Sequence, residues 1–170
     1  MRKLTTVFLM MLGTAGVATP ATRLRPPTLY VWNASDSIPV GLYRLQSVGE
    51  LSVTDLVAVQ ALEPLATFLA DGGYLPRGVP MLKRVLALPG QTVCRNAHTI
   101  TVDEIAMGEA RDQDSRGRSL PVWEGCRVVA EDELFLMNWQ SANSFDGRYF
   151  GVTPRDAVIA RAQPVWIKVH

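Results

Sequence analysis

The sequence predicts a mainly antiparallel β protein with one short helix. Three observations support this class: short runs rich in Val, Leu and aromatic residues recur along the chain, Gly, Pro, Asn or Asp bounds them, and a single segment has helical features. With 170 residues, of which 48% are hydrophobic, the chain is long enough for one domain with a packed core. This composition excludes disordered and collagen-like proteins.

The individual elements follow from where these runs begin and end. A short helix is expected at residues 64–70, because proline is tolerated in a first helical turn and a glycine pair follows the segment. Residues 107–120 alternate positive and negative charges, which favours a solvated loop or hairpin tip. We expect strands at residues 28–32, 41–46, 56–60, 81–88, 99–102, 134–138, 158–162 and 165–169.

The N-terminus has the features of an export signal. Arg2 and Lys3 precede an uncharged stretch whose apolar core covers residues 7–18 and is followed by small residues. A membrane span needs about 20 apolar residues, a length that this stretch reaches only if its threonines and glycines are counted. We therefore expect residues 1–21 to be a signal peptide or a retained membrane anchor, with the remainder on the outer side of a membrane.

The two cysteines are predicted to pair. In an oxidising compartment, two cysteines more often form a disulfide than remain as thiols. A nucleophilic cysteine would need a neighbouring base, and the only histidines, His98 and His170, form no Cys/His motif with Cys94 or Cys126. A structural Cys94–Cys126 disulfide would contribute about 3.5–4 kcal/mol through loop entropy.

The charge balance argues against nucleic-acid binding. Seventeen Lys and Arg residues face 16 Asp and Glu residues, which gives a formal net charge of +1, whereas nucleic-acid binders normally carry a strong basic excess. Two cysteines are too few for a Cys-only zinc site. The sequence indicates no metal and no cofactor.

A polar turn joins the first two predicted strands. Residues 33–43 read Asn-Ala-Ser-Asp-Ser-Ile-Pro-Val-Gly-Leu-Tyr, so Ser35 and Ser37 stand just before a proline and a glycine. Taken alone, this composition indicates no more than a turn.

Lys83 stands inside the apolar strand predicted at residues 81–88. Strand alternation places it on one face with Met81, Val85 and Ala87. Burial there would lower the pKa of its ammonium group from about 10.4, and a neutral lysine can take a proton from a serine hydroxyl. The alternative is a lysine whose stem lies on the surface with its charge in water.

A third polar segment, residues 143–151, reads Asn-Ser-Phe-Asp-Gly-Arg-Tyr-Phe-Gly. Taken alone, it indicates a loop with a local Asp146–Arg148 pair. Together and in this order, the three segments resemble the signal-peptidase-like serine peptidases of the S26 family, which use a Ser/Lys dyad. The closer resemblance is to the TraF-type conjugal-transfer branch of that family.

Four sequence boxes carry this resemblance, and they extend over nearly the whole chain after the N-terminal stretch. The nucleophile box Asn-x-Ser/Thr-x-Ser-x-Pro-x-Gly-x-Tyr matches residues 33–43, and a short Asp-x-Val box matches residues 55–57. The base box, Lys-Arg-Val followed by Pro-Gly, matches residues 83–85 and 89–90, and the box Ser-x-Asp-x-Arg-x-x-Gly matches residues 144–151. Ordinary leader peptidases have Ser-Met-x-Pro where this chain has Ser-Ile-Pro.

The resemblance implies a signal-peptidase-like catalytic domain over residues 22–170. In that domain Ser37 would be the nucleophile, Lys83 the general base and Asp146 a third residue needed for activity. The backbone N–H of Ser37 would hold the oxyanion. The resemblance also implies three supporting side chains: the Ser35 hydroxyl as a second oxyanion donor, Ser144 to aim the lysine amine, and Arg148 to pair with the aspartate.

The resemblance also implies a substrate and a location. The substrate would be the pilin precursor polypeptide used in conjugative DNA transfer and pilus assembly, cut by hydrolysis or joined head to tail. The enzyme would act in the periplasm, either unattached or tethered to the inner-membrane surface, where other conjugative-transfer proteins are potential partners. Trp32 and Trp139 are candidates for lipid contact or for core packing. The alternative function is a non-catalytic periplasmic pilus-assembly factor that holds the precursor.

Overall fold

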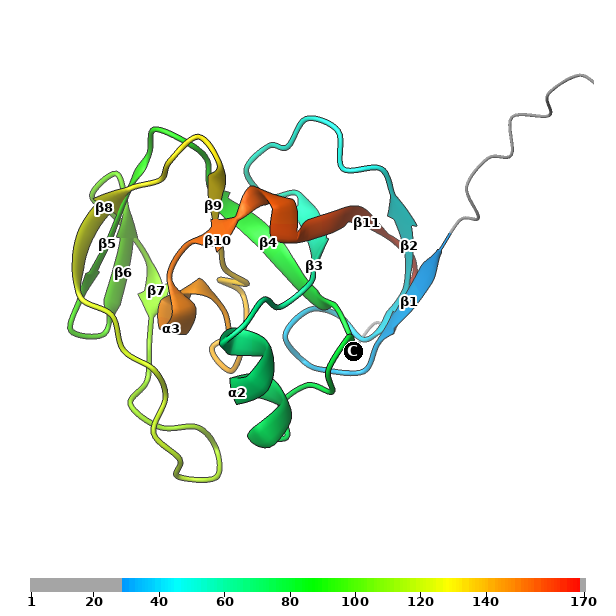
Figure 1. Cartoon of the computed structure of the whole chain (residues 1–170), viewed down its shortest axis with the longest axis horizontal. Coiled ribbons are helices and arrows are strands. Elements are labelled where there is room, and N and C mark those ends of the chain that lie inside the picture. The colour runs from blue at the N-terminus through cyan, green and yellow to red at the C-terminus, as the bar shows by residue number, and fades with distance from the viewer. Residues whose placement is uncertain (1–28, 169–170) are drawn as a thin grey trace, which may run out of the picture.

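The computed structural model describes residues 29–168 and contains two antiparallel β-sheets (Figure 1). The larger sheet has the strand order β1-β2-β11-β3-β4-β9-β10, and the smaller has the order β7-β6-β5-β8. The strands of the larger sheet are β1 (Tyr30–Asn33), β2 (Gly41–Gln46), β3 (Leu56–Val59), β4 (Met81–Ala87), β9 (Glu133–Leu136), β10 (Thr153–Pro154) and β11 (Val158–Ile167). Those of the smaller sheet are β5 (Thr92–Asn96), β6 (Thr99–Val102), β7 (Ile105–Glu109) and β8 (Gly125–Val128).

Helical structure is limited to short segments. Helix α2 (Leu65–Asp71) lies within a residue of the predicted helix, and α3 (Gly147–Phe150) and the 3-10 turn η1 (Arg155–Ala157) complete the set in residues 29–168. The predicted mainly antiparallel β class is therefore confirmed.

Several predicted boundaries are wrong. Strands β5 and β8 were not predicted, because they are short and contain charged and exposed residues that hide their β character. Strand β7 ends inside the predicted loop 107–120, at Glu109, and residues 110–120 form a charged loop closed by a Gln113–Ser119 bridge. The two runs predicted near the C-terminus form one strand, β11, because a register shift between Pro164 and Trp166 accommodates the proline.

The central strands β3 and β4 are buried on both faces. Along β4, Met81 and Val85 pack in one core cluster and Leu82 in another, so alternation leaves Lys83 on the side of Met81 and Val85, as predicted. Ala87 does not follow the predicted alternation. The register shifts between Val85 and Ala87 where β4 pairs with β9, and Ala87 therefore packs in a third cluster.

The smaller sheet packs against the larger one through strand β9. Val93 and Ile100 of the smaller sheet share a core cluster with Phe135 and Met137. Trp139 is half-buried against the same cluster, which favours the packing alternative for this residue.

Cys94 and Cys126 face each other across the pairing of β5 with β8. Their sulfur atoms form a disulfide, so the predicted pairing is confirmed. This bond joins two short strands at one edge of the smaller sheet.

The predicted signal or anchor, residues 1–21, lies outside the described residues. Within residues 29–168, no helix combines the length and apolar character needed to cross a membrane.

The disulfide predicts the labelling behaviour of the purified protein. Iodoacetamide added in denaturant without reductant should leave the intact mass unchanged, because neither sulfur is a thiol. After reduction, the mass should increase by one carbamidomethyl group for each of the two cysteines. Labelling of both cysteines before reduction would contradict the disulfide.

Candidate active site

The loop between β1 and β2 is shaped by the side chain of Asn33. Its Nδ2 donates to the carbonyl oxygens of Ser35 at 2.7 Å, Ile38 at 3.0 Å and Pro39 at 3.2 Å. The Tyr43 hydroxyl donates to the Pro39 carbonyl at 2.6 Å, and the Ile38 side chain is buried in the core. These contacts hold the loop in one shape and leave Ser35 exposed and Ser37 half-buried.

Gly41 is required by the sheet itself. A Cβ atom at this position would lie 2.1 Å from the Trp166 carbonyl oxygen and 2.8 Å from Ile167 Cα, both on the neighbouring strand β11. Backbone atoms cannot move aside as a flexible side chain can. The glycine in the box therefore lets β11 approach the end of the serine loop.

Ser35 and Ser37 are hydrogen-bonded to each other. Their Oγ atoms lie 2.8 Å apart, and Ser35 Oγ also donates to Asn33 Oδ1 at 2.9 Å. A hydroxyl group has one proton, so in this arrangement Ser37 donates to Ser35.

Lys83 is buried, with 5% of its surface exposed. Its Nζ donates to Ser144 Oγ at 3.0 Å. Burial lowers the pKa of Lys83 from 10.5 to about 8, the Asp146 carboxylate opposes this effect, and the Arg148 guanidinium adds to it. A larger fraction of this amine is therefore neutral at ordinary pH than in an exposed lysine.

Asp146 and Arg148 form a buried bidentate ion pair behind Ser144. Arg148 Nε lies 2.9 Å from Asp146 Oδ1, and Arg148 Nη2 lies 2.9 Å from Asp146 Oδ2. Arg148 Nη2 also donates to the carbonyls of Ser141 and Ser144. Asp146 additionally caps the N-terminus of α3. The pair thus fixes the loop that carries Ser144. It is fully buried, whereas the segment alone indicated only a local pair in a loop.

Asn138 contacts the candidate site, although the sequence did not indicate it as a site residue. Its Oδ1 accepts from the backbone N–H of Arg84 at 2.9 Å, and its Nδ2 donates to the carbonyl of Leu82 at 3.1 Å and, at 3.4 Å, to Ser144 Oγ. Asn138 therefore binds the backbone on both sides of Lys83. The available signal was a polar amide at the end of the apolar run 134–138, a place where a buried polar group needs partners.

Arg95 was also missed. This fully buried residue of β5 donates from Nη1 to the backbone carbonyl of Arg148 at 2.7 Å. It connects the smaller sheet, next to Cys94, to the helix that follows Asp146. A single arginine in a short, unpredicted strand gave no signal in the sequence.

Ser37 and Lys83 line the same groove, whose volume is about 560 Å³. We call it the serine–lysine groove; its other lining residues include Ser35, Leu75 and Phe145. In the part of the chain that the structure describes, no hydrogen bond joins Ser37 Oγ to Lys83 Nζ: Ser37 bonds to Ser35, and Lys83 bonds to Ser144. Asp146 and Arg148 do not line this groove.

The structure thus brings a serine hydroxyl and a buried amine of lowered pKa from separate parts of the chain to one groove. A family model described as "Signal peptidase, peptidase S26" matches residues 1–167, and the chain belongs to this family. The resemblance inferred from the sequence boxes is confirmed.

Proteins similar to this chain include conjugal and plasmid transfer proteins and a signal peptidase. The conjugal transfer protein TraF of Agrobacterium fabrum is 34% identical over 168 residues, covering 91% of this chain and 93% of the relative. The plasmid transfer protein TraF of Escherichia coli is 30% identical over 154 residues, covering 89% and 83%. A crystal structure of a signal peptidase I from Enterococcus faecalis is 18% identical and covers 68% of this chain and 98% of that chain, with a TM-score of 0.40.

The contacts of Asn138 predict a measurable effect on Lys83. Replacing Asn138 with alanine leaves the partly buried N–H of Arg84 unpaired, which should lower the free energy of unfolding by about 1–3 kcal/mol. Water that enters beside the loosened strand should raise the pKa of Lys83 from about 8 towards 10.5. Lysines occur only at positions 3, 83 and 168, so titration of ¹³C-lysine signals by NMR can follow it directly.

Asn96→Ala is the matched control, because Asn96 is exposed at the end of β5. This variant should retain both the stability and the Lys83 titration of the unmodified chain. An Asn138→Ala protein whose Lys83 titrates as before would show that Asn138 does not position the amine.

Proposed function

We propose that this chain is an exported serine peptidase in which Ser37 is the nucleophile and Lys83 the general base. The observation that carries the proposal is the state of Lys83: its amine is buried, its pKa is lowered to about 8, and it lines the same groove as Ser37. Neutral lysine is a base strong enough to activate a serine hydroxyl.

The proposed reaction moves one proton between these two side chains. Ser37 turns its hydroxyl from Ser35 to Lys83, and the neutral amine takes the proton as Oγ attacks the scissile carbonyl. The C–N bond of the substrate then breaks, and the ammonium group of Lys83 returns the proton to the leaving amine. Water, or an amine of the substrate in ring closure, displaces Ser37 from the acyl-enzyme.

The remaining candidate residues support this reaction from fixed positions. When the Ser37 hydroxyl leaves Ser35, the Ser35 hydroxyl can join the backbone N–H of Ser37 as an oxyanion donor. Ser144 aims the Lys83 amine through the 3.0 Å hydrogen bond. Asp146, whose carboxylate already binds Arg148 and the backbone of Asn138, acts through its charge and by holding the Ser144 loop.

The names of the relatives support a proposal for the substrate. Relatives that are 30–34% identical to this chain are named conjugal or plasmid transfer proteins, which supports a role in conjugation. We propose that the substrate is the pilin precursor, processed in the periplasm at the inner-membrane surface and in contact with other conjugative-transfer proteins.

An exposed aromatic pair supports contact with a membrane surface. Trp32 on β1 and Trp166 on β11 flank Leu42 and stack with their ring centroids 5.7 Å apart. More than half of each tryptophan is exposed, beside exposed Tyr30 and Val165. Tryptophan suits a membrane interface because it is apolar with one polar group.

One observation favours the second candidate function, a non-catalytic pilus-assembly factor. Ser37 Oγ bonds to Ser35 rather than to Lys83 in the described structure. A protein that only holds the precursor would not need to break that bond.

Substitutions at the two proposed catalytic positions separate these functions. Ser37→Ala and Lys83→Met should each reduce kcat/KM for the pilin precursor by about 10⁴-fold or more, as measured by mass spectrometry of the products, and should abolish plasmid transfer by a complemented donor. Lys83→Arg should be equally inactive, because arginine keeps its proton. Lys83→Met should be at least as stable as the unmodified chain at pH 7, since it removes a buried charge. Normal processing by Ser37→Ala and Lys83→Met would support the assembly factor.

The lowered pKa of Lys83 predicts how activity depends on pH. The base must be neutral, so kcat/KM should fall about tenfold for each pH unit below about 8 and level off above it. Rates at constant ionic strength give this profile, and far-UV circular dichroism at each pH checks that the chain stays folded. A value of kcat/KM that stays constant from pH 6 to pH 8 would contradict a base with a pKa of about 8 and would show that Lys83 is not the general base.

A further inference from the structure

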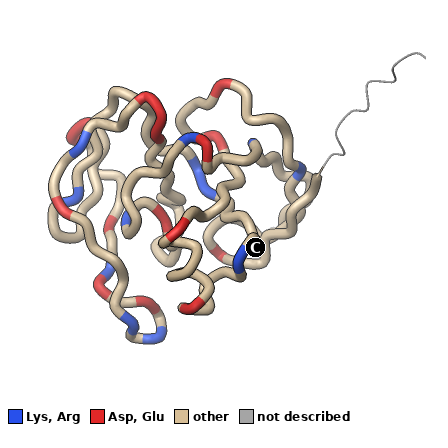
Figure 2. The backbone as a smooth tube through the Cα atoms, viewed as in Figure 1, with Lys and Arg blue, Asp and Glu red and all other residues tan. Residues whose placement is uncertain are grey.

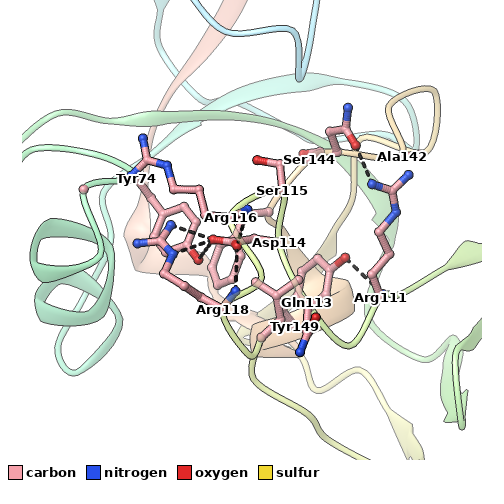
Figure 3. Close-up of a pocket in the computed structure, with 14 residues that line it drawn as sticks. Tyr74, Arg111, Gln113, Asp114, Ser115, Arg116, Arg118, Ala142, Ser144 and Tyr149 are labelled. Carbon is pink, nitrogen blue, oxygen red and sulfur yellow. Dashed lines mark hydrogen bonds and ion pairs between the residues drawn. The ribbon is translucent and has the colours of Figure 1, made fainter.

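A second cavity, of about 330 Å³, adjoins the serine–lysine groove (Figure 3). The charged loop, residues 110–120, forms one side of it, and Tyr74, Asn143 and Phe145 form part of the other. Three arginines line it: Arg111, Arg116 and Arg118. We call this cavity the arginine pocket.

Among residues 29–168, the only carboxylate that lines the arginine pocket is already paired with an arginine. Asp114 accepts hydrogen bonds from the Tyr74 hydroxyl at 2.6 Å and from Arg118 Nε at 2.7 Å, and its Oδ1 accepts from the backbone N–H groups of Arg116 and Arg118. These bonds hold the pKa of Asp114 well below its usual range, and the bond from Tyr74 has the largest effect. Asp114 therefore stays ionised and balances Arg118.

Two positive charges remain. Among residues 29–168, neither Arg111 nor Arg116 forms a salt bridge, and Arg111 Nη1 donates to the neutral Asn143 Oδ1 at 2.7 Å. Both arginines are exposed. Figure 2 shows the charged loop at the lower left, with both basic and acidic positions along it. The arginine pocket thus has a positive lining with guanidinium groups that can bind a carboxylate in bidentate fashion.

The arginine pocket and the serine–lysine groove share three lining residues, Tyr74, Asn143 and Phe145. Asn143, which Arg111 binds, directly precedes Ser144, the partner of Lys83. A polypeptide that lies in the groove and continues past Phe145 would therefore enter the arginine pocket.

We propose that the arginine pocket binds an acidic residue of the polypeptide substrate and so selects substrates with an acidic side chain near the bond to be cleaved. This inference rests on the proposed peptidase function, because it treats the adjoining groove as the place where the substrate lies. The site requires a carboxylate, which Arg116 and Arg111 bind beside the aromatic wall of Tyr74 and Phe145.

An acidic lipid headgroup is the less suitable occupant. The exposed tryptophans lie on β1 and β11, and in Figure 1 β1 is at the opposite side of the molecule from the charged loop. A membrane in contact with the tryptophans would lie beside the part of the serine–lysine groove that Trp32 lines, whereas a substrate chain that leaves the groove past Phe145 would reach the arginine pocket.

The test uses paired peptides and a charge reversal. The substrates are alanine-rich peptides with a quenched fluorophore. Each peptide carries a single Glu, and its partner peptide carries Gln at the same position. The set of pairs places this residue at every position of the peptide in turn. At low salt, Glu should raise kcat/KM about two- to fivefold over Gln at the position that reaches the arginine pocket, and high salt should remove the difference. Arg116→Glu should abolish or invert this preference. Arg44→Glu, an equal charge change at the exposed residue of β2, should retain it.

A second measurement does not depend on cleavage. The full-length Ser37→Ala protein is titrated with acetylated triglutamate or triglutamine while the arginine side-chain Nε–Hε signals are followed by NMR. Triglutamate alone should shift the signals of Arg111 and Arg116.

The outcomes are distinguishable. Peptides cleaved without any Glu preference, or a preference unchanged in Arg116→Glu, would overturn the arginine pocket and leave the peptidase intact. If no peptide is cleaved, the peptidase proposal loses support, and the NMR titration decides the arginine pocket: equal responses to the two peptides overturn it. Binding to anionic phosphatidylglycerol vesicles that Arg116→Glu abolishes and Arg44→Glu preserves would assign the pocket to lipid instead.

Discussion

The burial of the Lys83 amine is the constraint on which the rest of the site depends. An ammonium group among apolar neighbours loses its hydration, and the pKa of Lys83 falls to about 8 as a result. The surroundings reduce this cost without removing it: Ser144 accepts one hydrogen bond, Asp146 supplies an attractive charge and Arg148 an opposing one. The amine can therefore exist in both protonation states near neutral pH.

A buried polar layer holds this arrangement in place. Asp146 and Arg148 satisfy each other and the backbone around them, and Asn138 binds the strand on both sides of Lys83. Arg95 extends the layer to the smaller sheet, where the neighbouring disulfide joins two short strands. Because buried polar groups are costly when unpaired, a fully bonded layer of this kind favours a single geometry. Residues of both sheets thus help to fix the position of the Lys83 amine.

The serine box is mostly structural. Of its specified residues, Asn33 and Tyr43 hold the loop by hydrogen bonds to backbone carbonyls, and Gly41 permits the close approach of β11. Only Ser35 and Ser37 present hydroxyl groups to the groove. The box therefore describes how to build a loop that offers two hydroxyls, which explains why several non-reactive residues belong to it.

The sequence by itself determined the features that depend on local chemistry. Strand alternation indicated the β class and the face of Lys83, turn residues located the serine loop, and the ordered boxes identified the family. The tertiary structure alone decided what depends on distant partners. Strands β5 and β8 are too short and polar to predict and form through their neighbours, and a register shift moved Ala87 to another cluster. Asn138 and Arg95 belong to the site only because the fold brings remote backbone groups within hydrogen-bonding distance, and no local pattern encodes which remote group each of them binds.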